Sequence, residues 1–249
     1  MASTSETGHG KNVTNFKTLI IYCKDFGADY NPSETSITIP QLDLQLPLAL
    51  NSLKLVTSLN EIDLKAREAR YLIFNPLDAL VTRIINALGA SKVEDNTLKT
   101  ATSHASKIKG ERIGKKLPPK TDPNDPKDEP KDSSRSVSQQ SFDSIVNNFD
   151  ALIQTLKNEP NYKPNETDLK VVTLEALYND MELKNTAVIN TEKDLSNARL
   201  DRNNILYNEK TGLVATALQI KKYVKSVYSP THSKYKQISG LAFKRYKVQ

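Results

Sequence analysis

The chain has 249 residues, enough for one large domain or two modest ones with a buried core. Hydrophobic residues make up 37% and charged residues 26%, with no Trp and only 8 Gly, a composition that favours helices over sheets. The net charge is +6, a single Cys excludes an intramolecular disulfide, and no apolar run approaches the roughly 18 residues of a membrane span, so we expect a cytoplasmic protein.

The first part of the chain contains a helical segment followed by a stretch with a different periodicity. Within "FKTLIIYCKDFGADYNPSET" (16 to 35), Cys23 falls at an apolar helical position, and we expect it to be a small buried hydrophobe. Residues 35–39 and the leucines of 42–50 alternate as a strand would, although Pro40 and Pro47 interrupt that pattern. A short strand or hairpin is therefore the alternative to a helix here.

Residues 42–74 are predicted to form one long amphipathic helix. Its apolar residues lie on two neighbouring stripes, one with Leu46, Leu50, Leu53, Leu64, Tyr71 and Phe74, the other with Leu48, Leu55, Leu59, Ile62, Ala66, Ala69 and Ile73. Together they form an apolar face too broad for a single coiled-coil seam. A shorter helix is predicted to follow over 77–89.

A polar stretch separates this region from the rest of the chain. Residues 114–140 contain five prolines and dense charges of both signs, with almost no apolar side chain. Such a composition buries too little surface to offset the entropy cost of ordering. We therefore predict a flexible, charged, Pro-rich linker between residues 1–113 and residues 141–249.

Helical periodicity resumes after the linker. Apolar residues at helical spacing over 142–156 predict a buried helical face that ends before Pro160, and Asn165 has the position of an N-cap. No Pro or Gly interrupts residues 165–211, which predicts a second long helix. A third, shorter helix is expected over 212–228.

The two halves share residues in the same order. "YNPSET" (30 to 35) matches "YKPNET" (162 to 167), Phe16 matches Phe149, and Arg70 matches Arg202. The order holds over about a hundred residues, which indicates a tandem duplication. The predicted fold class is therefore all-α, with two tandem homologous helical-bundle units, one long amphipathic helix in each, and elongated antiparallel packing.

The sequence offers little chemistry. The three histidines, His9, His104 and His232, lie in no metal-binding pattern, and His104 and His232 fall at similar places in the two halves, as inheritance from a duplicated loop would leave them. Acidic residues interleave with Lys and Arg as on a solvated helix face. We expect no enzyme: no catalytic residue, no metal site and no cofactor.

Recurring arginines allow two interpretations. Arg67, Arg70, Arg199 and Arg202 lie next to alanines on the apolar faces of the long helices. They either form a buried polar layer that fixes register or binds an anion, or pack their stems on the face with the guanidinium groups at its edge. The second interpretation is the one we favour.

The last 29 positions carry basic residues and no acidic one. The candidate anion or nucleic-acid contacts are Lys221, Lys222, Lys225, Lys234, Lys236, Lys244, Arg245 and Lys247. Interleaved tyrosines would suit stacking on bases, and a basic stretch can also lie on an anionic membrane. The favoured explanations are lysines that collect at helix C-termini, where the helix dipole stabilises them, or a protein partner.

Several of these features resemble a group of uncharacterised bacterial proteins of similar length. The shared features are the N-terminal "MASTSETGHGKNVTNF", the paired loops, "LSNARLDRNNILYN" and "SPTHSKYKQISGLAFK". The resemblance implies a bacterial, cytoplasmic setting and no particular activity. The sequence therefore predicts a non-enzymatic helical scaffold or protein–protein interaction protein that self-associates; a nucleic-acid-binding protein is the alternative, and a membrane-active protein is least favoured.

Overall fold

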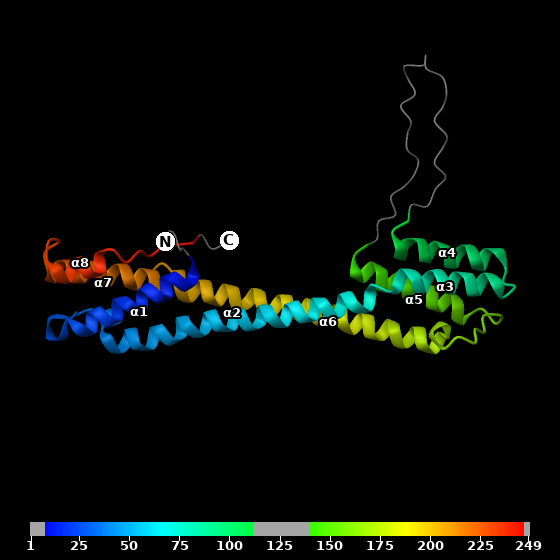
Figure 1. Ribbon diagram of the computed structural model, residues 1–249, viewed down its shortest axis with the longest axis horizontal. Helices are drawn as coiled ribbons and strands as arrows, with labels where there is room; N and C mark the ends of the chain where they lie inside the picture. The colour runs from blue at the N-terminus through cyan, green and yellow to red at the C-terminus, as the bar shows by residue number, and fades with distance from the viewer. Residues whose placement is uncertain (1–7, 112–139, 247–249) are drawn as a thin grey trace, which may run out of the picture. The chain divides into compact units, whose positions relative to one another are not determined.

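The computed structural model describes residues 8–111 and 140–246, and within these ranges every regular element is helical (Figure 1). The all-α prediction is confirmed. The α-helices are α1 (His9–Asp25), α2 (Ile39–Phe74), α3 (Leu77–Ala90), α4 (Asp95–Lys109), α5 (Phe142–Lys157), α6 (Val171–Tyr207), α7 (Leu213–Val227) and α8 (Ser233–Ser239). Short 3-10 turns occupy Gly27–Asp29, Thr35–Ile37 and Thr167–Leu169.

The chain folds into two compact units that each combine residues from both halves of the sequence. The terminal unit comprises Met1–Leu64 with Thr191–Gln249, and the central unit comprises Lys65–Asn190. The chain passes from one unit to the other within α2 and within α6. This division differs from the predicted repeats 1–113 and 141–249, because each unit takes elements from both of them.

The terminal unit packs α1 against α7 and α8 (Figure 1). Phe16 and Leu19 of α1 are fully buried, and so are Leu213 and Ile220 of α7. The beginning of α2 and the end of α6 complete this core. The apolar face of α1 is therefore covered by helices that lie almost two hundred positions later in the sequence.

The central unit packs α4 against both α3 and α5. Its core contains the fully buried Ile84 and Leu88 of α3 with Phe149 and Leu152 of α5, and α6 contributes Leu174. Ser141 caps the N-terminus of α5 by accepting a hydrogen bond from the main-chain N–H of Ser144 at 3.2 Å.

The two loops with matching sequences fold alike. The hydroxyl of the buried Tyr30 donates to the carbonyl oxygen of Ile37 at 2.6 Å, and the hydroxyl of the buried Tyr162 donates to that of Leu169 at 2.9 Å. In each case the loop leads through a 3-10 turn into a long helix. Each tyrosine thus fixes the direction in which the long helix starts.

Several boundaries differ from the sequence predictions. Residues 39–50 are helical, so the strand alternative is wrong, and α2 continues through Pro47. α6 begins at Val171, later than the expected N-cap at Asn165, because a 3-10 turn intervenes. The shorter helices predicted over 77–89 and 212–228 correspond to α3 and α7.

The predictions omit α4 and α8. α4 carried a readable signal, with apolar residues at Leu98, Ala101, Ala105 and Ile108 and a Gly110 that ends the helix with a positive φ of 67°. α8 has only 7 residues, too few for a periodic pattern. The predicted linker, 114–140, lies outside the described residues except for Gln140, whose side-chain amide donates to the carbonyl oxygens of Lys107 and Ile108.

Candidate interaction surfaces

The structure assigns different surroundings to the eight predicted anion or nucleic-acid contacts. Lys222, Lys225, Lys236, Lys244 and Arg245 are exposed, and Lys247 lies outside the described residues. Lys221 is partly buried, with Nζ donating to the carbonyl oxygens of Ser239 at 2.8 Å and Leu241 at 3.0 Å. Burial lowers the pKa of this ammonium group. Lys221 therefore acts within the fold, holding the chain as it leaves α8.

Lys234 also makes contacts inside the terminal unit. Its Nζ donates to Asp29 Oδ2 at 3.0 Å, and the Tyr228 hydroxyl donates to the same oxygen at 2.8 Å. These hydrogen bonds, that from Lys234 first, lower the pKa of the Asp29 carboxyl. The imidazole of His232 stacks on Tyr228 with ring centroids 4.8 Å apart and accepts a hydrogen bond from the main-chain N–H of Lys234 at the start of α8.

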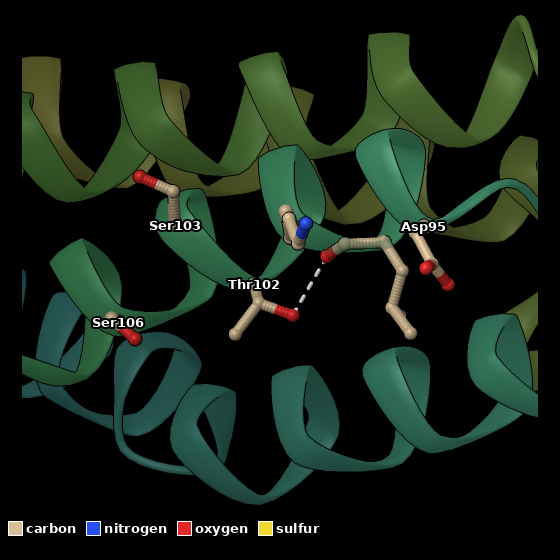
Figure 2. A pocket seen from close by; sticks show the side chains of 6 residues that line it. Asp95, Thr102, Ser103 and Ser106 are labelled. Atoms are coloured by element: carbon tan, nitrogen blue, oxygen red, sulfur yellow. Dashed lines mark hydrogen bonds between the residues drawn. The ribbon is translucent and has the colours of Figure 1, made fainter.

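The described residues include no group of three or more His, Cys, Asp or Glu side chains that could hold a metal ion. An open depression of about 470 Å³ lies along α4 and is lined by Asp95, Leu98, Lys99, Thr102, Ser103 and Ser106 (Figure 2). The Thr102 hydroxyl donates to the carbonyl oxygen of Leu98 at 2.7 Å, so its proton is already engaged. The polar groups of the lining are those of Asp95 and Lys99 and the hydroxyl groups of Thr102, Ser103 and Ser106.

Of the recurring arginines, Arg70 is partly buried, and its guanidinium group takes part in a polar cluster between helices. Its Nη1 donates to Asn185 Oδ1 at 2.9 Å, and its guanidinium group lies 3.8 Å from the ring centre of Phe142. Asn185 in turn donates to Asp143, which ties α2, α6 and α5 together in the central unit. Arg202 is partly buried and donates to Asn203 Oδ1, whereas Arg67 and Arg199 are exposed.

A second polar contact joins the long helices in the terminal unit. Asp63 is 5% exposed, and its Oδ1 accepts a hydrogen bond from the Thr191 hydroxyl at 2.9 Å. A buried carboxylate is costly to leave without partners, so the α2–α6 pairing is favoured in the register that supplies them. Sequence reasoning treated this acidic residue as part of a solvated face.

A line of exposed apolar side chains runs along α2. Leu44, Leu48, Leu55 and Ile62, which we call the α2 stripe, are 62%, 58%, 50% and 48% exposed. Their spacings of four, seven and seven residues place them along one side of a helix. The sequence analysis assigned Leu48, Leu55 and Ile62 to an apolar stripe but could not say that this stripe stays exposed.

By length and composition alone, the helical stretch Ile39–Ala90 is apolar enough to cross a membrane, with 28% of its most apolar window buried. The expectation that no stretch comes near this limit is therefore not met. Core helices of soluble proteins also meet this criterion of length and composition.

No protein-family model matches this chain, and no curated protein or solved structure matches it either.

Proposed function

We propose that this protein is a non-enzymatic helical interaction protein that self-associates through the α2 stripe. The observation that carries the proposal is the exposure of four large aliphatic side chains in a line on a helix of 36 residues. Large apolar side chains left open to water along one helix favour association, because covering them removes apolar area from solvent at about 25 cal/mol per Å².

The proposed occupant of the stripe is the α2 stripe of a second copy. Spacings of seven residues fit the seam of a two-helix coiled coil, in which each side chain inserts between residues of the facing helix. A twofold axis would place the same patch on both partners, the usual arrangement in homodimers. Polar residues between the apolar positions, such as Asn51 and Ser58, are exposed in the same line and would lie within the seam.

We also propose that the chain arose by tandem duplication and that the two copies swap helices, so that each compact unit combines helices from both copies. Its support is the matching order of elements, α1–α2–α3–α4 and α5–α6–α7–α8, and the equivalent hydrogen bonds of Tyr30 and Tyr162. In this view each compact unit contains one copy of every element type, with the long helices crossing from one unit to the other.

The test is a charge introduced into the α2 stripe. Leu48→Lys combined with Leu55→Lys should shift the protein to a monomer, because two lysines cannot be buried in an apolar seam. The matched control is Leu200→Lys on α6, a leucine of similar exposure (52%) outside the stripe. Sedimentation equilibrium over a range of micromolar concentrations measures the mass, which is 27.8 kDa for the monomer.

A wild-type protein that stays monomeric at every concentration would refute self-association. Loss of binding to anionic lipid vesicles in the double variant, with an unchanged sedimentation mass, would assign the stripe to a membrane surface instead. An equal effect of Leu200→Lys would show that the α2 stripe has no special role.

A further inference from the structure

The segment that follows α8 lies along α1 and has no regular secondary structure over residues 241–246. Asn15 contacts residue 242 and Asn12 contacts residue 244, so the segment runs antiparallel to α1. In Figure 1 it leaves α8 and returns beside α7 toward the start of α1. We call the surface of α1 and α7 beneath it the tail groove, and residues 241–246 the tail.

The tail groove holds the tail by its main chain. Asn12 donates from Nδ2 to the carbonyl oxygen of Lys244 at 2.8 Å and accepts at Oδ1 from the N–H of Lys244 at 3.1 Å. Asn15 donates to the carbonyl oxygen of Ala242 at 2.7 Å. Two asparagine side chains on successive turns of α1 thus act as the edge of a strand would, pairing with alternate residues of the tail.

A side chain of α7 holds the start of the tail. Lys221 on α7 donates to the carbonyl oxygens of Ser239 and Leu241. Ser239 is the last residue of α8 and Leu241 is the first residue of the tail, so Lys221 ties the end of α8 to the start of the tail. None of the four hydrogen bonds that hold the tail uses one of its side chains, so they do not depend on the sequence of the tail.

Selectivity comes instead from apolar side chains of the tail. Leu241, Phe243 and Tyr246 pack, partly buried, against the core of the terminal unit. The Tyr246 ring lies 5.2 Å from the ring of His9 and 5.6 Å from that of Tyr207. Lys244 and Arg245 remain exposed, and their charges take no part in the attachment.

The central unit uses the matching asparagine differently. Asn148 precedes the buried Phe149 as Asn15 precedes Phe16, and both asparagines are buried. However, Asn148 donates to the carbonyl oxygen of Ser144 within its own helix, and α4 packs on α5. Holding an extended main chain is therefore a feature of the terminal unit and not a consequence of the helical packing common to both.

We propose that the tail groove is a peptide-binding site and that the tail is its displaceable intramolecular ligand. The partner it fits is an extended peptide segment with large apolar side chains at its first, third and sixth positions. Because the bonds go to main-chain atoms, a segment of another protein with this pattern satisfies them equally well. The proposal does not depend on the α2 stripe.

A tethered ligand competes strongly with a free one, since a short link gives an effective concentration of about 1 mM or more. A free peptide should therefore bind weakly to the wild-type chain and well to a chain whose tail has been released. Phe243→Ser with Tyr246→Ser in the full-length protein weakens the tail and leaves Asn12, Asn15 and Lys221 intact.

The experiment measures fluorescence anisotropy of a labelled synthetic peptide, "SGLAFKRYKVQ". We expect at least about tenfold tighter binding to the released chain than to the wild type. Replacing Lys244 of the peptide by Gln should leave affinity unchanged. Methylating the main-chain nitrogen of Lys244 should weaken binding about fivefold or more, because it removes the donor to Asn12. Asn12→Leu in the released chain should weaken binding similarly.

Equal affinity of the released chain for the N-methylated and unmethylated peptides would overturn main-chain recognition, and this comparison changes only the peptide. Absence of binding to the released chain would overturn the peptide site, provided that hydrogen exchange shows the Lys244 amide to be unprotected. If that amide stays protected after both serine substitutions, the assigned role of Phe243 and Tyr246 is wrong. Loss of affinity on Lys244→Gln would indicate charge recognition instead.

Discussion

Two histidines lie where their surroundings lower the pKa, one in each compact unit. For His104 the largest cause is burial, followed by repulsion from Lys107, while a hydrogen bond with Asn148 acts in the opposite direction. For His9 burial comes first and the positive charge of Arg202 second. A proton on either imidazole is therefore bound less tightly in the folded protein than in the unfolded chain.

The free energy of unfolding should consequently fall as the pH drops below the ordinary histidine pKa of 6.5. Above that pH both rings are neutral in the folded and in the unfolded chain, so they add nothing to the pH dependence of the free energy of unfolding. His104→Gln should make this decrease in the free energy of unfolding smaller, and the decrease that remains should be the contribution of His9. Urea unfolding followed by circular dichroism at about pH 7.5 and about pH 5.5 measures the difference. An identical pH dependence in the two proteins would contradict the assignment to His104.

Cys23 illustrates a residue whose environment was readable from the sequence. It is 1% exposed, and burial raises the pKa of its thiol to about 12. The group therefore stays protonated and acts as a small apolar side chain in the core, as its helical position predicted.

At the scale of elements, α2 and α6 are almost equal in length, at 36 and 37 residues, but only α2 contains a proline in its interior. Pro47 has no N–H to donate to the carbonyl group of Asp43, and its ring crowds that carbonyl. The proline lies between Leu42 and Ala49, both of which are fully buried in the terminal unit. The helix continues because packing on each side of Pro47 outweighs this local cost.

Pro47→Ala should therefore raise the free energy of unfolding by about 1–3 kcal/mol, since the main-chain hydrogen bond is restored at an exposed position. Chemical denaturation compares the variant with the wild type. Thr57→Ala, exposed on α2 outside the α2 stripe, serves as the control for a simple gain in helix propensity. A destabilised Pro47→Ala protein would mean that the proline imposes a bend that the packing of Leu42 and Ala49 requires.

At the scale of the whole molecule, each core is completed by residues from both halves of the chain. Phe16 shares its core with Leu213 and Ile220 from the other half of the chain. Phe149 likewise shares its core with Ile84 and Leu88. A fragment with only one half of the sequence would therefore expose part of every apolar face it carries. Cooperative stability should belong to the complete chain rather than to either half.

Fragments 1–113 and 141–249 should each show little cooperative unfolding when produced alone, and should regain it when mixed. Circular dichroism during thermal unfolding measures this for each fragment, for the mixture and for the intact chain. Mixing the first fragment with a second fragment that carries Phe149→Ala should restore less stability, because a fully buried Phe contributes about 3–5 kcal/mol. Independent, cooperative folding of residues 1–113 would contradict the observed division of the cores.

The candidate surfaces were only partly predictable. Apolar spacing identified most of the α2 stripe, but an apolar residue at a helical position looks the same whether a neighbour covers it or not. The sequence did not single out Asn12 and Asn15. Both are buried and bind the main chain of the tail, but in a sequence an asparagine of this kind looks the same as one on an exposed polar helix face. Lys221 was recognised as part of a basic region, yet its role depends on where the tail passes.

From the sequence alone most of the helices could be predicted, although α4 and α8 were not, because the periodicity that defines a helix is local and survives without knowledge of its neighbours. The two long helices, the shorter ones after them and the burial of Cys23 all follow from that spacing. Only the tertiary structure decided which helices share a core and which apolar side chains remain in contact with water. The physical reason is that hydrophobic burial is non-directional: the face of α1 is satisfied by any apolar surface of suitable shape, and in this protein α7 and α8 supply it.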